Sequence, residues 1–177
     1  LKMSNTKVIT GKVRFSYAHV FEPSAIEEGQ TKKYSCAILV PKKDKKTIAK
    51  IEEAIKAALE EGKGKFGGKI PAAYKNPLRD GDLEKEDDEV YAGHMFFNAS
   101  ALRKPQLVDA DLNPILDRDE FYSGCYGRAS INFYAFNTAG NKGVAAGLNN
   151  LQKLEDGDKL GGSPASAEDD FGDDDLN

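Results

Sequence analysis

Aromatic and basic side chains alternate along residues 124–137, with the two-residue period of a β-strand. One face would be small and apolar, as suits a core: Cys125, Ala129, Ile131, Phe133 and Ala135. The opposite face would carry Tyr126, Arg128, Ser130, Asn132, Tyr134 and Phe136. Aromatic rings that stack on bases, together with cations that contact phosphates, bind single-stranded nucleic acid without sequence choice. The pattern therefore indicates a nucleic-acid-binding strand.

The same combination recurs on other predicted strands. Phosphates would be captured by Lys12, Arg14, Arg103, Lys104 and Arg128, and bases would stack on Phe96, Tyr126, Tyr134 and Phe136. Asn98, Ser130 and Asn132 could add hydrogen bonds to bases or sugars. The competing interpretation is that each aromatic residue packs beneath a helix or loop, but burial alone would not place Arg128 and Asn132 between aromatic residues.

Catalytic chemistry has little support in the sequence. His19 and His94 have no carboxylate or Cys partner at motif spacing, and the Gly- and Lys-rich residues 62–69 depart from a phosphate-binding loop motif. Cys36 and Cys125 are far apart, so buried, reduced thiols are expected rather than a zinc site or a disulfide. We expect no cofactor, no metal and no enzymatic activity.

An acidic run at residues 80–89 leaves one enzymatic alternative open. It contains seven acidic residues and one basic residue, and paired carboxylates could hold the metal ions of a nuclease. Consecutive acids on a loop point in different directions, whereas catalytic carboxylates generally come from separated rigid elements. The nuclease is therefore the less favoured hypothesis.

Charge is divided unevenly along the 177 residues. The chain has 25 Lys and Arg against 29 Asp and Glu, but nine of the acids and only one of the bases lie in residues 155–177. The preceding part carries a surplus of four positive charges, and a surplus of ten if residues 80–89 are set aside. A basic body of this kind favours a polyanionic partner, although a protein-interaction module that meets an acidic protein is a second alternative.

The elements that must position these residues are mostly strands. Strands are predicted over residues 7–17, 32–40, 91–102, 124–137 and 144–154, with a shorter one within 103–109, whereas residues 21–29 and 62–89 are expected to be loops. The 7–17 strand would pack Ile9, Val13, Phe15 and Tyr17 on one face. Asp44 is a plausible N-cap for an amphipathic helix over 45–61, which Gly62 ends. This order predicts a mainly β fold, an OB-fold-like antiparallel five-stranded barrel with one packed α-helix.

Three blocks of the chain resemble the OB-fold single-stranded DNA-binding proteins of tailed bacteriophages, a family first catalogued as a domain of unknown function. They are residues 124–137, residues 140–153 (Gly-Asn-Lys-Gly-Val-Ala-Ala-Gly-Leu-Asn-Asn-Leu-Gln-Lys) and residues 156–162 (Asp-Gly-Asp-Lys-Leu-Gly-Gly). The resemblance covers most of residues 7–162 and suggests an Enterobacter phage member in particular. It adds Lys142 to the expected binding residues.

The resemblance implies a protein that coats and protects single-stranded DNA in phage replication, recombination and repair, in the cytoplasm of the infected host. Its partners would be the DNA, phage or host replication proteins, and further copies of itself on DNA, but no membrane. Residues 1–6 would be a flexible N-terminus in which Leu1 and Lys2 precede Met3 as an expression remnant, and 7–160 the binding domain. Residues 161–177 would be a disordered acidic tail that regulates DNA access through Asp169, Asp170, Phe171, Asp173, Asp174 and Asp175.

Overall fold

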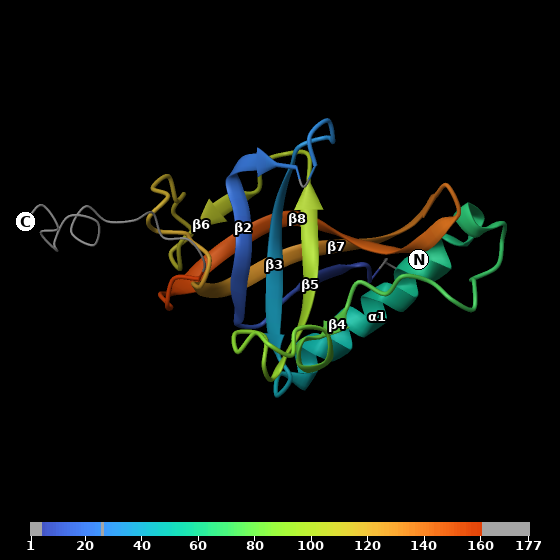
Figure 1. Cartoon of the computed structure of the whole chain (residues 1–177), viewed down its shortest axis with the longest axis horizontal. Helices are drawn as coiled ribbons and strands as arrows, with labels where there is room; N and C mark the ends of the chain where they lie inside the picture. Colours follow the sequence, from blue (N-terminus) through green and yellow to red (C-terminus); the bar gives the residue numbers. More distant parts are fainter. Residues whose placement is uncertain (1–4, 26, 161–177) are drawn as a thin grey trace, which may run out of the picture.

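Five strands close into a ring in the computed structural model, which describes residues 5–25 and 27–160. The ring runs β2 (Val13–Ser24), β3 (Lys33–Pro41), β5 (His94–Ala101), β8 (Asn141–Glu155) and β7 (Tyr126–Thr138), and β7 pairs with β2 to close it (Figure 1). The long β7–β8 hairpin reaches beyond the ring, and α1 (Lys45–Glu61) runs alongside it. The mainly β fold with one packed helix is as the sequence predicts.

The sheet is mixed rather than wholly antiparallel, which corrects the prediction from sequence. β5 and β8 pair in parallel, whereas the other four pairs in the ring are antiparallel. The reason is geometric: strand directions cannot alternate all the way around a closed ring with an odd number of members. One parallel pair is therefore unavoidable in a five-stranded ring.

Short elements attach to this ring. β1 (Lys7–Ile9) pairs with β7, β4 (Arg79–Asp80) with β5, and β6 (Gln106–Val108) with β8 in parallel. The 7–17 strand predicted from sequence is thus two strands, because the chain bends at Gly11 and Lys12, and the register with β7 shifts by one residue between Ile9 and Val13. β2 also continues through Ser24, into residues predicted as a loop.

The helix α1 has the predicted bounds and the predicted cap. The Thr47 amide donates to Asp44 Oδ1 at 3.1 Å, which satisfies one of the amides that a helix N-terminus leaves without a partner. Gly62 ends the helix against β7, where an added Cβ would lie 2.3 Å from that of Ala135. The turn η1 (Lys63–Phe66) then buries Phe66 in the core.

The core fills the ring and the space beneath α1. Phe15, Ile38, Phe97, Ile131 and Phe133 are each at most 1% exposed, and the predicted apolar face of β7 is buried throughout. Both cysteines are buried and free, as predicted, and burial raises the pKa of each thiol. In the described part of the chain, no helix combines the length and the apolar character needed to cross a membrane.

Candidate nucleic-acid interface

A groove crosses the outer surface of the ring over β2, β3 and β5. Two adjoining pockets of about 410 and 380 Å³ share Tyr17, His19 and Tyr91 in their linings. A third pocket of about 240 Å³ shares Arg79 and Asn98 with the second. We call these three pockets together the outer groove. Its length across several strands suits an extended polymer better than a compact small ligand.

Tyr17 projects into the outer groove because β2 bulges at this point. The register between β2 and β3 shifts between Ser16 and His19, and Tyr17 has a φ of 45°. Bulges re-aim side chains, and positive φ is uncommon for residues other than Gly. As a result Ser16 is 5% exposed and Tyr17 62%. The sequence prediction that Tyr17 packs on the same face as Phe15 is therefore wrong.

Strand pairing lays a row of small and polar residues across the ring. His19 is opposite Ser35, Ser35 opposite Ser100, Ser100 opposite Gly147, and Gly147 opposite Asn132. Four of these five residues have side chains that can donate or accept hydrogen bonds, and Gly147 leaves the backbone accessible at close range. The row therefore offers a low, polar path that leads from β2 to β7.

Residues 79–91 form a wall along one side of the outer groove. Lys42, which follows β3, places its Nζ 2.7 Å from Asp80 Oδ1 and 2.7 Å from Asp82 Oδ2. These hydrogen bonds raise the pKa of Lys42 and lower the pKa of both carboxyl groups. Gly81 allows the segment to approach closely, because an added Cβ would lie 2.3 Å from the Tyr91 carbonyl oxygen. The wall is thus fastened to the end of β3.

Phe96 lies beneath this wall, which corrects the expectation that its ring is exposed. It is 2% exposed and meets Tyr91 edge-on, with ring centroids 5.0 Å apart. Ala37 and Leu39 complete this small apolar cluster outside the ring. Lys85 Nζ lies 5.7 Å from the centroid of the Tyr91 ring, and burial raises the pKa of Tyr91. The alternation along β5 places Phe96 outward, but only the tertiary structure reveals what covers it.

The predicted outward face of β7 is present, and part of it adjoins the outer groove. Asn132 ends the polar row, and Tyr134 is 45% exposed beside Gly147, whose added Cβ would lie 3.6 Å from Tyr134 Cε1. Phe136 is half-buried and lines the third pocket. Arg128 is farther along the strand, where its Nε donates to the Thr10 carbonyl oxygen at 2.8 Å and it lines a separate pocket of about 120 Å³.

Lys12, Arg14 and Tyr126 form a cluster outside the outer groove. The Lys12 ammonium and the Arg14 guanidinium lie 5.3 and 5.2 Å from the centroid of the Tyr126 ring. Lys12 pairs with Glu155, and Arg14 donates to the carbonyl oxygens of Gly124 and Asp158 at 3.0 and 2.9 Å. These contacts hold the chain that follows β8. The three residues stay predicted DNA contacts, but they also have a clear structural role.

The remaining predicted residues are dispersed. Arg103 and Lys104 are exposed between β5 and β6, with Lys104 Nζ 5.6 Å from the centroid of the Phe21 ring. Lys142 is half-buried near the hairpin tip, and its carbonyl oxygen accepts from the Lys75 amide at 2.9 Å. The predicted tail residues lie outside the described part of the chain.

Sequence reasoning missed several residues that line the outer groove: Tyr17, His19, Ser35, Lys75, Arg79 and Lys85. The basic ones lie within or beside the acidic run, in residues expected to be a long connection. Their positive charge was a usable signal, but nothing local indicates that this connection folds back over β5. Lys42 also changes the interpretation of the run, because an ammonium sits where a nuclease would need a cation bound by Asp80 and Asp82.

Comparison with known proteins places this arrangement in a family. The model of the family described as Enterobacter phage Enc34, ssDNA-binding protein, matches residues 6–177. A protein designated p50 of Acyrthosiphon pisum secondary endosymbiont phage 1 is 35% identical over 173 residues, which cover 92% of this chain and 91% of that protein.

Solved structures share the fold. The single-stranded DNA-binding protein of bacteriophage Enc34, in complex with single-stranded DNA, superposes with a TM-score of 0.79 at 24% identity, over 91% of this chain and 96% of that one. The single-stranded DNA-binding protein gp2.5 of bacteriophage T7 gives a TM-score of 0.60 at 14% identity, over 96% of each chain. The chain belongs to the Enc34 family of phage single-stranded DNA-binding proteins, which are not enzymes.

Proposed function

We propose that this protein binds single-stranded DNA without sequence choice along the outer groove. One observation carries the proposal: exposed Tyr17, the polar row and the basic residues Lys75, Arg79 and Lys85 line one continuous path. An aromatic ring supplies a surface for base stacking, and the cations supply phosphate contacts. We also assign the ring to the OB-type barrels, which commonly bind oligonucleotides on the face of their second and third strands.

The β7 side extends this interface. Asn132, Tyr134 and Phe136 continue the path beyond β5, and Lys142 lies close to Lys75 at the hairpin. Lys12, Arg14, Tyr126, Arg103, Lys104 and Arg128 would contact DNA that runs past the ends of the outer groove. We propose that copies of the protein coat DNA in this way during phage replication, recombination and repair, in the cytoplasm of the infected host.

The acidic tail would regulate this interface. Leu160 lines the 410 Å³ pocket, and its amide donates to the Ser123 carbonyl oxygen at 2.9 Å, so the last described residue lies at the rim of the outer groove. A tethered polyanion there would compete with DNA for the basic residues and, once displaced, would be available to replication proteins.

Fluorescence anisotropy with a labelled mixed-sequence single strand tests the proposal. Arg79→Gln should weaken binding, because one phosphate contact is lost. For the same reason it should reduce the slope of log Kd against log salt concentration by about one. Arg118→Gln is the matched control, since Arg118 is also an exposed, ion-paired arginine but lines none of the three pockets. Equal effects of the two variants, or stronger binding to the matching duplex, would contradict binding in the outer groove.

A further inference from the structure

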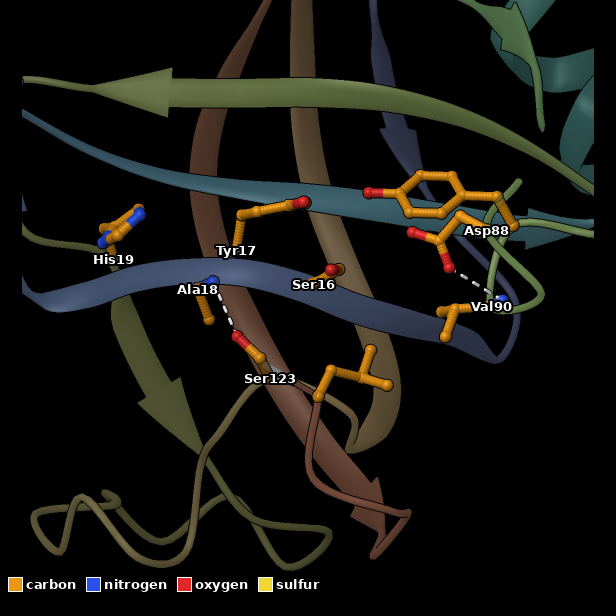
Figure 2. A pocket seen from close by; sticks show the side chains of 9 residues that line it. Ser16, Tyr17, Ala18, His19, Asp88, Val90 and Ser123 are labelled. Atoms are coloured by element: carbon orange, nitrogen blue, oxygen red, sulfur yellow. Dashed lines mark hydrogen bonds between the residues drawn. The ribbon is translucent and has the colours of Figure 1, made fainter. Parts of the chain in front are cut away.

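One end of the outer groove is a pocket with an acidic residue inside it. The 410 Å³ pocket lies between Tyr17 and His19 on β2 and the loop that carries Asp88 and Val90, with Ser123 on a third side (Figure 2). Its volume is in the range of about 300 to 1,000 Å³ that is usual for small-molecule sites. A carboxylate is unexpected in a path for a polyanion, because it repels phosphates. The pocket therefore fits a base better than the DNA backbone.

The loop holds the Asp88 carboxylate at the pocket. Asp88 Oδ1 accepts from the Val90 amide at 3.0 Å (Figure 2). The Asp88 amide donates to the Lys85 carbonyl oxygen at 3.0 Å. A carboxylate has about four acceptor positions on two oxygens, so the contact with Val90 leaves capacity for a ligand. The Ser123 hydroxyl oxygen, which accepts from the Ala18 amide at 3.0 Å, can still donate its proton.

Bases differ in what they can offer to a carboxylate. Guanine presents two adjacent donors, N1–H and the exocyclic N2 amino group, which match two carboxylate oxygens. Cytosine and adenine present one amino group beside a ring acceptor, and thymine presents a single N–H between two carbonyl oxygens. Acceptor atoms on a base repel the carboxylate oxygens. The expected order of preference therefore places guanine first and thymine last.

We infer that this pocket is a single-base subsite that prefers guanine, with Asp88 as its specificity-determining residue and Tyr17 as its stacking surface. The inference rests on the proposed function, because it assigns a base preference to one end of the outer groove. It adds a local bias to binding that is otherwise indifferent to sequence. The positive φ of Tyr17 fits this role, since strained residues concentrate at ligand sites.

The test uses the full chain and short labelled oligonucleotides in a lithium buffer, which prevents guanine quadruplexes. Oligo-dT is compared with the same strand carrying one central guanine, adenine or cytosine. One guanine should tighten binding about tenfold, the effect of one good two-point base contact. Inosine in its place, which lacks the N2 amino group, should lose most of this gain, whereas 7-deazaguanine should keep it.

Asp88→Asn should abolish the guanine preference, because an amide offers one acceptor oxygen and its amino group opposes the guanine donors. The oxygen can still accept from Val90, so the loop is retained. Asp87→Asn removes the same charge from an exposed neighbour that does not line the pocket, and should leave the preference unchanged. Equal affinity for guanine and thymine strands in the unmodified protein would overturn the inference alone. A failure to bind any strand would instead overturn the proposed function.

Discussion

Tyr17 illustrates how one residue can reverse its role through backbone geometry. The alternation of β2 assigns it to the core, yet the bulge after Ser16 turns it outward, to 62% exposure. A non-glycine residue at a φ of 45° costs free energy that the surrounding pairing must offset. An exposed aromatic ring held in this way offers a surface on which a base can stack.

Tyr17→Ala should weaken single-stranded DNA binding by about 1 to 3 kcal/mol, the contribution of one stacked base. Tyr17→Phe should bind nearly as well as the unmodified protein, because the ring and not the hydroxyl carries the effect. Anisotropy titrations at one fixed salt concentration measure both variants. Equal loss in the Phe and Ala variants would assign the effect to the hydroxyl and contradict stacking.

Gly127 shows the tightest backbone constraint within β7. An added Cβ would lie 1.7 Å from the Gln152 carbonyl oxygen on β8 and 3.0 Å from the Phe15 ring. Gly127→Ala should therefore lower the free energy of unfolding by about 1 to 3 kcal/mol, the usual cost of overpacking. Gly64→Ala is the matched control, because nothing lies within 4 Å of an added Cβ there. Urea denaturation of both variants measures the difference, and similar midpoints would contradict the close β7–β8 contact.

At the scale of elements, the wall of residues 79–91 has little regular structure of its own and is held in part by a polar clamp. β4 and α2 (Gly81–Glu84) are short, and their polar attachment to β3 is Lys42 with Asp80 and Asp82. Segments with few contacts open locally at a low free-energy cost. The wall should therefore loosen without unfolding of the ring.

Lys42→Met should increase amide hydrogen exchange across residues 80–92 while the core strands keep their protection.

The clamp should also depend on pH. Because Lys42 lowers the pKa of Asp80 and Asp82, their stabilising contribution is present above the usual Asp pKa and is lost as the pH falls through their lowered values. The difference in free energy of unfolding between Lys42→Met and the unmodified protein should thus vanish in strong acid. A difference that persists there would mean that Lys42 acts by packing.

At the scale of the whole molecule, charge is separated between a basic body and an acidic C-terminus. The exit of the chain at Leu160 is fixed near the outer groove by Arg14, by Tyr122 and by the pairing of Lys153 with Asp156. Seventeen further residues can extend about 55 Å at most, enough to cross the face of a domain of this size. If the tail acts as proposed, a tether of this reach would hold its acidic residues at high effective concentration near the outer groove.

A chain that ends at Gly162 should bind single-stranded DNA more tightly than the full chain, and the gain should shrink as salt rises. The control keeps the length and replaces Asp169, Asp170, Asp173, Asp174 and Asp175 by Asn, which should reproduce most of the gain. Anisotropy at low and moderate salt measures all three proteins. Unchanged affinity on truncation would leave the tail as a docking or solubility segment only.

Elements that depend on short-range interactions could be predicted from the sequence. Asp44 and Gly62 bound α1 correctly because capping is local, and the two-residue period of β7 separated buried Ile131 and Phe133 from exposed Asn132 and Tyr134. The blocks within residues 124–162 also carried the family resemblance, and the match over residues 6–177 confirms it.

Tertiary structure alone decided where these elements meet. Ring closure with five strands required one parallel pair, but no strand's own pattern can reveal that this pair is β5–β8. The bulge at Tyr17 depends on pairing with β3, and the burial of Phe96 depends on a wall clamped by Lys42 from a distant part of the chain. Long-range contacts are not encoded in local periodicity, so the surface that faces the ligand could be located only once the ring was closed.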